Sequence, residues 1–170
     1  MINPRIQLTL FVDENKSQQI EEIRDEFNPE QFQLIKSHVT LIRDEELEQI
    51  EKVLINLSSL NHSYITIHFG KMIRFAEGKG VILPATETNE SFHQLRSCVL
   101  KGITNPFRKP APHITLMHPR NSTCTDQVFE TISKTDTPGL LVFKTISLIE
   151  QYPGCKWEPL KSFELKNPSS

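Results

Sequence analysis

The stretches Ser37-His38-Val39-Thr40-Leu41 and Pro112-His113-Ile114-Thr115-Leu116 decide how this sequence folds. Each contains a histidine, an aliphatic residue, a threonine and a second aliphatic residue, in that order. Along a β-strand this alternation sends the histidine and the threonine to one face and the two aliphatic side chains to the other. Each stretch therefore predicts a half-buried strand that presents an imidazole beside a hydroxyl.

The segments around the two stretches follow a common order. In each half the His-x-Thr strand comes after a loop, and a helix and then antiparallel strands follow it. This order indicates an internal duplication in which each half contributes one sheet and one motif strand. We expect the halves to pack about a pseudo-twofold axis.

Hydrophobic periodicity divides the rest of the chain into further strands and helices. Alternating apolar residues predict strands at 6–12, 38–42, 61–69, 72–75, 81–83, 113–117, 139–149 and 157–165. Helical spacing predicts helices at 17–26, with a break at Asn28-Pro29, and at 44–57, 88–100 and 125–134, with Asp44 as the N-cap of the second. The three prolines of 105–112 predict a loop, because proline fixes φ and lacks a backbone donor.

The composition is that of a globular domain. The chain has 170 residues, of which 37% are hydrophobic and 24% charged, so it can bury a sizeable core as one domain over 1–170 with two lobes. A net charge of −2 argues against binding to duplex nucleic acid but allows a local basic cleft for a small phosphate ligand. We expect a monomer.

The three cysteines are odd in number and lack C-x-x-C spacing, so the sequence predicts neither a disulfide framework nor a thiolate zinc site. The N-terminal residues lack the pattern of a signal peptide, and no apolar run approaches the roughly 18 residues of a membrane span. We therefore expect a cytoplasmic protein without membrane insertion.

Two imidazoles that face each other across a cleft suit chemistry at phosphorus. In-line displacement needs a base for the attacking water and an acid for the departing oxygen, and histidine, with an ordinary pKa near 6.5, can serve as either at neutral pH. The two threonine hydroxyls can hold the non-bridging oxygens. The residues do not decide whether His38 or His113 is the base.

The tetrads His38-Val39-Thr40-Leu41 and His113-Ile114-Thr115-Leu116 make the chain resemble the 2H phosphoesterase superfamily, which includes cyclic phosphodiesterases and 2′-5′ RNA ligases. The resemblance implies a bilobal α+β fold whose antiparallel sheets line a central groove, with helices on the outside. It implies hydrolysis of a 2′,3′-cyclic phosphate of a nucleotide or RNA end to a 2′-phosphomonoester, without a metal or another cofactor. A binding module without turnover and the ligase reaction are the alternatives.

Further binding residues are suggested by position. Arg43 and Arg120 follow their motif histidines by five and seven positions and could donate to phosphate, although strand alternation points Arg43 away from His38. Arg108 and Lys109 precede the second motif and are more typical of a solvated loop. His118 could support the site or lie at the surface.

Aromatic residues offer candidates for stacking on a base. Tyr152, Trp157, Phe75 and Phe11 could each do so, with packing in the core or at the rim as the competing interpretation. The other histidines, at positions 62, 68 and 93, have no partners at metal-ligand spacing, and we interpret them as structural or exposed.

Overall fold

The structure is a computed structural model that describes residues 3–103 and 108–168. Residues 105–107 of the predicted proline-rich loop therefore lie outside the described residues. Across the described residues, no helix is both long and apolar enough to cross a membrane.

The described residues form nine strands, five α-helices and one 3₁₀ helix. The strands are β1 (Arg5–Phe11), β2 (His38–Ile42), β3 (Ile65–His68), β4 (Ile73–Phe75), β5 (Gly80–Pro84), β6 (His113–Met117), β7 (Leu140–Phe143), β8 (Thr145–Gln151) and β9 (Glu158–Glu164). The helices are α1 (Gln18–Phe27), α2 (Pro29–Leu34), η1 (Asp44–Glu46), α3 (Ile50–Ser58), α4 (Glu90–Val99) and α5 (Asp126–Ile132).

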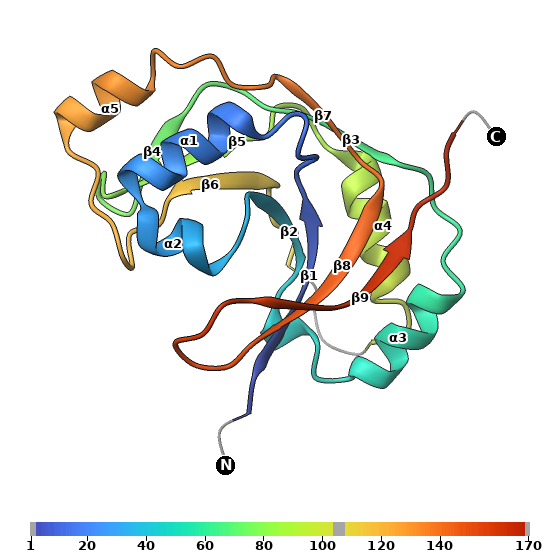
Figure 1. Ribbon diagram of the computed structural model, residues 1–170. Coiled ribbons are helices and arrows are strands. Elements are labelled where there is room, and N and C mark those ends of the chain that lie inside the picture. The colour runs from blue at the N-terminus through green and yellow to red at the C-terminus, as the bar shows by residue number, and fades with distance from the viewer. Residues whose placement is uncertain (1–2, 104–107, 169–170) are drawn as a thin grey trace.

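One large antiparallel sheet dominates the fold, with the strand order β4-β5-β6-β2-β1-β8-β9, while β3 and β7 pair separately (Figure 1). This confirms the predicted α+β class. The expected arrangement of one sheet per half is wrong, because the two motif strands pair directly, Val39 with Ile114. Their backbone groups thereby satisfy each other and join both halves in one sheet. The pseudo-twofold relation stays a prediction.

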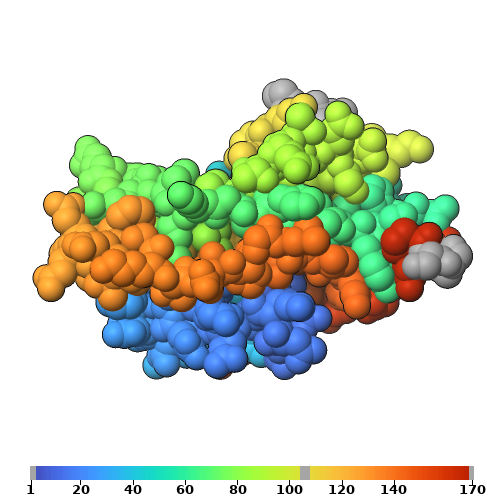
Figure 2. All heavy atoms as spheres, turned by 90° about the horizontal axis from the view of Figure 1, so that it is seen from above, coloured from blue at the N-terminus to red at the C-terminus, as the bar shows by residue number. Residues whose placement is uncertain are grey.

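The helices lie around this sheet in two groups. α1 packs on β6, while α4 packs on α3 and on β3, and the two groups stand at opposite sides of the view in Figure 1. Figure 2 shows the segment from α5 to β7, in orange, crossing the molecule between α1 in blue and the green segment that contains β4.

The aliphatic residues of both motifs belong to the core. Val39 and Leu41 are fully buried, and Ile114 and Leu116 are at most 1% exposed. The burial patterns of β2 and β6 are identical residue by residue, with the histidine and threonine partly buried in each. The predicted alternation is thus confirmed, and it turns the polar pair of each strand away from the core.

The helix predicted at 44–57 is shorter and divided. The chain forms only the 3₁₀ helix η1 at Asp44–Glu46 before α3 begins at Ile50. Asp44 is not an N-cap, since its Oδ1 accepts a hydrogen bond from the backbone N–H of Ile6, 2.8 Å away. Side chains at the start of the segment are thus held by other parts of the fold, which the local helical pattern does not reveal.

Candidate active site

The polar residues of the two motifs meet on one face of the sheet. Val39 and Ile114 are antiparallel partners. In this register His38 lies opposite Thr115 and Thr40 lies opposite His113, so each motif histidine faces the threonine of the other motif. Opposite residues on one face have Cβ atoms about 4.5–5.5 Å apart, and diagonal neighbours are about 7–8 Å apart. The imidazoles therefore occupy one diagonal of a square and the hydroxyls the other, a spacing that suits one phosphate between them.

Both imidazoles are held by the backbone in the same way. His38 Nδ1 lies 2.7 Å from the carbonyl oxygen of Lys36, and His113 Nδ1 lies 3.1 Å from that of Ala111. A carbonyl oxygen only accepts, so Nδ1 carries the proton in each ring. In the neutral ring Nε2 is then an acceptor, which is the state that a general base requires.

Burial lowers the pKa of His38 from 6.5 to about 4. The hydrogen bond to the Lys36 carbonyl opposes this decrease, while the neighbouring Arg24 and His113 add to it. Phe11 covers one side of the imidazole, with a ring-centroid distance of 6.1 Å. His38 is therefore neutral at pH 7, because a pKa near 4 leaves the ring unprotonated there.

One cavity of about 280 Å³ contains the four motif residues. Its described lining is dominated by guanidinium groups, with two carboxylates. The arginines are Arg5, Arg24, Arg43 and Arg120, and the acids are Asp44 and Glu45. The excess of positive charge favours an anionic ligand.

The structure brings three of the four predicted binding residues to this cavity. Arg43, Arg120 and Trp157 line it, whereas Tyr152, among the described residues, lies outside the lining and is half exposed. Strand alternation predicted that Arg43 points away, but β2 ends at Ile42, so the alternation does not extend to Arg43. Arg43 also lies 3.7 Å from Glu45, and both side chains are exposed.

Arg24 is a lining residue that the sequence analysis missed. It is only 2% exposed and donates to a carboxylate oxygen of Glu21 and to the carbonyl oxygen of Ile35, each at 2.7 Å. A sequence signal does exist, since Arg24 follows Ile20 by four positions and thus shares the apolar stripe of α1. A charged residue in such a stripe needs a partner inside the protein.

The described polar lining also includes Arg5, Gln7, Gln31 and His118. The backbone N–H of Arg120 donates to His118 Nδ1 at 3.1 Å, and burial, followed by the charge of Arg120, lowers the pKa of His118. The Arg5 guanidinium lies 5.2 Å from the centroid of the Trp157 ring. Such a cation–π contact attracts the Trp157 ring to the guanidinium group at the cavity.

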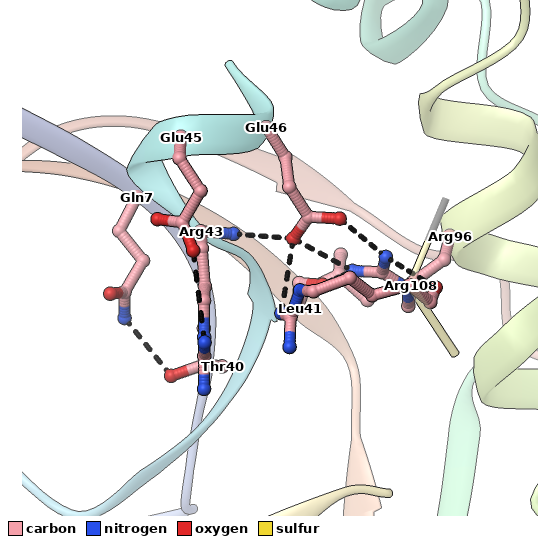
Figure 3. A network of polar contacts seen from close by, with 8 residues as sticks. All are labelled: Gln7, Thr40, Leu41, Arg43, Glu45, Glu46, Arg96 and Arg108. Carbon is pink, nitrogen blue, oxygen red and sulfur yellow. Dashed lines mark hydrogen bonds and ion pairs between the residues drawn. The ribbon is translucent and has the colours of Figure 1, made fainter. Parts of the chain in front are cut away.

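A partly buried ionic network borders the site at the end of the first motif strand (Figure 3). Glu46 accepts hydrogen bonds from Arg96 Nη2 at 2.6 Å and from the backbone N–H of Arg43 at 3.1 Å, and Arg108 approaches it at 3.4 Å. Arg96 also donates to the carbonyl oxygen of Leu41. Burial alone would raise the pKa of Glu46, but these hydrogen bonds and positive charges outweigh it and lower that pKa.

A larger cavity of about 810 Å³ lies against α4, and its described lining includes none of the four motif residues. Across the described residues, no three or more His, Cys, Asp or Glu side chains gather as a metal site would require. The motif cavity is therefore the candidate site, and its donors are imidazoles, hydroxyls, amides and guanidinium groups.

Comparison with known families agrees with this pairing of two His-x-Thr strands in one sheet. The profile of the 2′-5′ RNA ligase superfamily matches residues 12–154, and the chain belongs to that superfamily. No curated protein matches the sequence at a significant level.

Several solved structures share the fold. The crystal structure of E. coli LigT with phosphate has a TM-score of 0.66 at 16% identity and covers 98% of this chain and 100% of LigT. LigT with 3′-AMP gives 0.67 at 18%, covering 96% and 99%, and a crystal structure described as a phosphoesterase gives 0.65 at 16%, covering 96% and 99%. At these identities the likeness establishes the fold.

Proposed function

We propose that this protein hydrolyses a cyclic phosphodiester, the 2′,3′-cyclic phosphate of a nucleotide or RNA end, to a 2′-phosphomonoester without a metal ion. The observation that carries the proposal is the meeting of His38 and His113 at one arginine-lined cavity, each with Nδ1 held by a backbone carbonyl. Superfamily membership supports phosphoester chemistry. E. coli LigT has been crystallised with phosphate, 3′-AMP, NADP⁺ and ATP, which supports a nucleotide ligand here.

Because its lowered pKa keeps His38 neutral at pH 7, with Nε2 free to accept, we assign His38 to receive the proton of the attacking water. The water oxygen forms a bond to phosphorus while its proton passes to His38 Nε2. The bond between phosphorus and the ribose O3′ breaks, and His113 protonates O3′ as it leaves. The products are a 2′-phosphomonoester and a free 3′-hydroxyl, and proton exchange with solvent restores both rings.

The remaining residues hold the substrate. Thr40 and Thr115 donate to the non-bridging oxygens, whose negative charge the surrounding arginines stabilise. Arg43 and Arg120 line the cavity with exposed guanidinium groups that can fill this role, and Trp157 offers a ring on which a base can stack. The cavity of about 280 Å³ favours a terminal nucleotide over a duplex.

The test is a panel of 2′,3′-cyclic nucleotides and 2′-5′-linked dinucleotides, assayed in EDTA. We expect release of 2′-phosphomonoesters, and a decrease in rate of about 10²–10⁴ in both His38→Ala and His113→Ala, with folding checked by circular dichroism. Retained turnover in both variants would exclude the assignment. A rate lost in EDTA and restored by a divalent metal would contradict the metal-free mechanism.

The same panel separates the alternatives. Binding of the cyclic nucleotides without any product would indicate a binding module for nucleotides or RNA ends. Joining of RNA ends through a 2′-5′ linkage, with no hydrolysis of cyclic phosphates, would indicate that ligation is the relevant reaction.

A further inference from the structure

Gln7 lies beside the first motif but belongs to neither His-x-Thr stretch. It is on β1, two residues before Thr9, and therefore on the same face of that strand. Thr9 in turn is the direct partner of Thr40 across the β1–β2 ladder. The cross-strand pairing thus places an amide, a buried hydroxyl and the motif hydroxyl side by side on the face that carries the site.

The amide nitrogen of Gln7 contacts both hydroxyls. Nε2 lies 2.7 Å from Thr9 Oγ1 and 3.2 Å from Thr40 Oγ1 (Figure 3 shows the second contact). An amide NH₂ has two hydrogens, one for each of these oxygens, and both hydroxyls therefore accept. Thr9 is fully buried, so its hydroxyl holds the amide of Gln7 from within the protein.

A threonine hydroxyl has one hydrogen and two lone pairs. Once Thr40 Oγ1 accepts from Gln7, the hydroxyl hydrogen is directed away from the amide, and Thr40 itself lines the motif cavity. We propose that Gln7 is a positioning residue that sets the direction of the Thr40 hydroxyl, so that this hydroxyl donates to the substrate phosphate; this rests on the proposed function.

The second half-site differs at the equivalent place. The direct partner of Thr115 on its outer neighbour β5 is Ile82, and the position two residues before it, which corresponds to Gln7, is Gly80, which has no side chain to donate. The two motifs therefore look equal in sequence but are unequal in structure. The first one receives a hydroxyl whose orientation is set before the substrate binds, and such preorganisation favours stabilisation of developing charge.

The experiment is a double-mutant cycle on the full-length protein. Gln7→Leu removes the donor, Thr40→Val removes the hydroxyl, and Thr115→Val is the matched control in the other half-site. We expect Gln7→Leu to lower kcat about tenfold, the cost of one hydrogen bond. It should have almost no further effect in the Thr40→Val background, but should multiply with Thr115→Val.

Gln7→Glu separates positioning from packing, since it keeps the size and shape of the side chain. A carboxylate at position 7 accepts only, so the Thr40 hydroxyl would turn its hydrogen toward it and away from phosphate. We expect kcat to decrease at least as much as in Gln7→Leu, while the urea midpoint of Gln7→Glu stays closer to that of the wild type. Wild-type kcat in Gln7→Glu would overturn the proposal.

The affinity for inorganic phosphate can be measured from the fluorescence of Trp157, and this measurement does not depend on turnover. If the wild type hydrolyses no ester but the effects of Gln7→Leu and Thr40→Val on phosphate affinity are coupled, the positioning role stands and the proposed function fails. If the wild type is active and the two substitutions act independently on both kcat and phosphate affinity, the positioning role is wrong and the proposed function stands.

Discussion

At His38, the burial that keeps the imidazole neutral at pH 7 also makes the folded protein sensitive to acid. The ring has a pKa of about 4 in the folded protein and an ordinary value of 6.5 when unfolded. Between these two values the unfolded chain binds a proton that the folded protein does not. The free energy of unfolding must therefore decrease as the pH is lowered from about 6.5 to about 4.

This difference in pKa corresponds to about 3 kcal/mol at most. We expect His38→Gln to lose that part of the pH dependence, so that the stabilities of the variant and the wild type converge, or cross, toward pH 4. Urea unfolding at half-unit steps between pH 7 and pH 4 measures it, with His62→Gln as a control outside the candidate cavity. A constant difference between His38→Gln and wild type across this range would contradict the lowered pKa.

At the residue scale, the sequence predicts which side chains share a face of a strand, because that depends only on alternation within the strand. His38 and Thr40 share a face with their counterparts because β2 and β6 are regular strands with buried aliphatic partners. Gln7 and Arg24 were missed because their place at the site depends on how β1 pairs with β2 and where α1 packs. The spacing within α1 indicates that Arg24 is buried but not that it lines the site, and no spacing within β1 distinguishes Gln7.

At the element scale, the network around Glu46 joins three segments that border the cavity. Arg96 on α4 reaches both η1, through Glu46, and the end of β2, through the Leu41 carbonyl. Arg96 Nη2 also donates to the carbonyl oxygen of Arg108, at 3.2 Å, in the segment that leads to β6. The network thus fixes the end of the first motif strand and the approach to the second.

Glu46 and Arg96 are 11% and 4% exposed, so removing one partner leaves the other charge buried. We expect Glu46→Ala to lower the free energy of unfolding by about 3–5 kcal/mol. Urea unfolding followed by Trp157 fluorescence measures this. The matched control is Lys134→Met, which removes an exposed ion pair with Glu130 and should cost less than about 1 kcal/mol. Equal effects of the two substitutions would show that the Glu46 pair is not a structural link.

The same network explains why the helix predicted from Asp44 onward was wrong. The apolar spacing of the segment is helical, and α3 does form at Ile50–Ser58. Its first residues, however, use their side chains elsewhere, Asp44 toward the backbone of β1 and Glu46 toward Arg96. These tertiary hydrogen bonds hold the start of the segment as a separate 3₁₀ turn, and local periodicity cannot anticipate them.

At the scale of the whole molecule, the site depends on two segments far apart in the chain. Alternation predicted each motif strand, and the repeated order of elements predicted that the two would meet. The repeated order of elements did not predict that they meet as neighbours in one seven-stranded sheet. Which strands become neighbours is decided by the packing of the whole chain. A ligand held between the motifs therefore bridges both halves of the protein.

This bridging predicts joint protection of the two motif strands when an anion binds. A ligand that binds the intact site, and not its locally unfolded form, stabilises the intact form by about 2.7 kcal/mol at a concentration of 100 times its Kd. We expect saturating phosphate to slow amide hydrogen exchange of β2 and β6 by the same factor, up to about 100-fold, wherever exchange occurs by local opening. Helix α5 contributes none of the described lining residues and serves as the internal control. Protection of only one motif strand would mean that phosphate is held by one half-site and not between them.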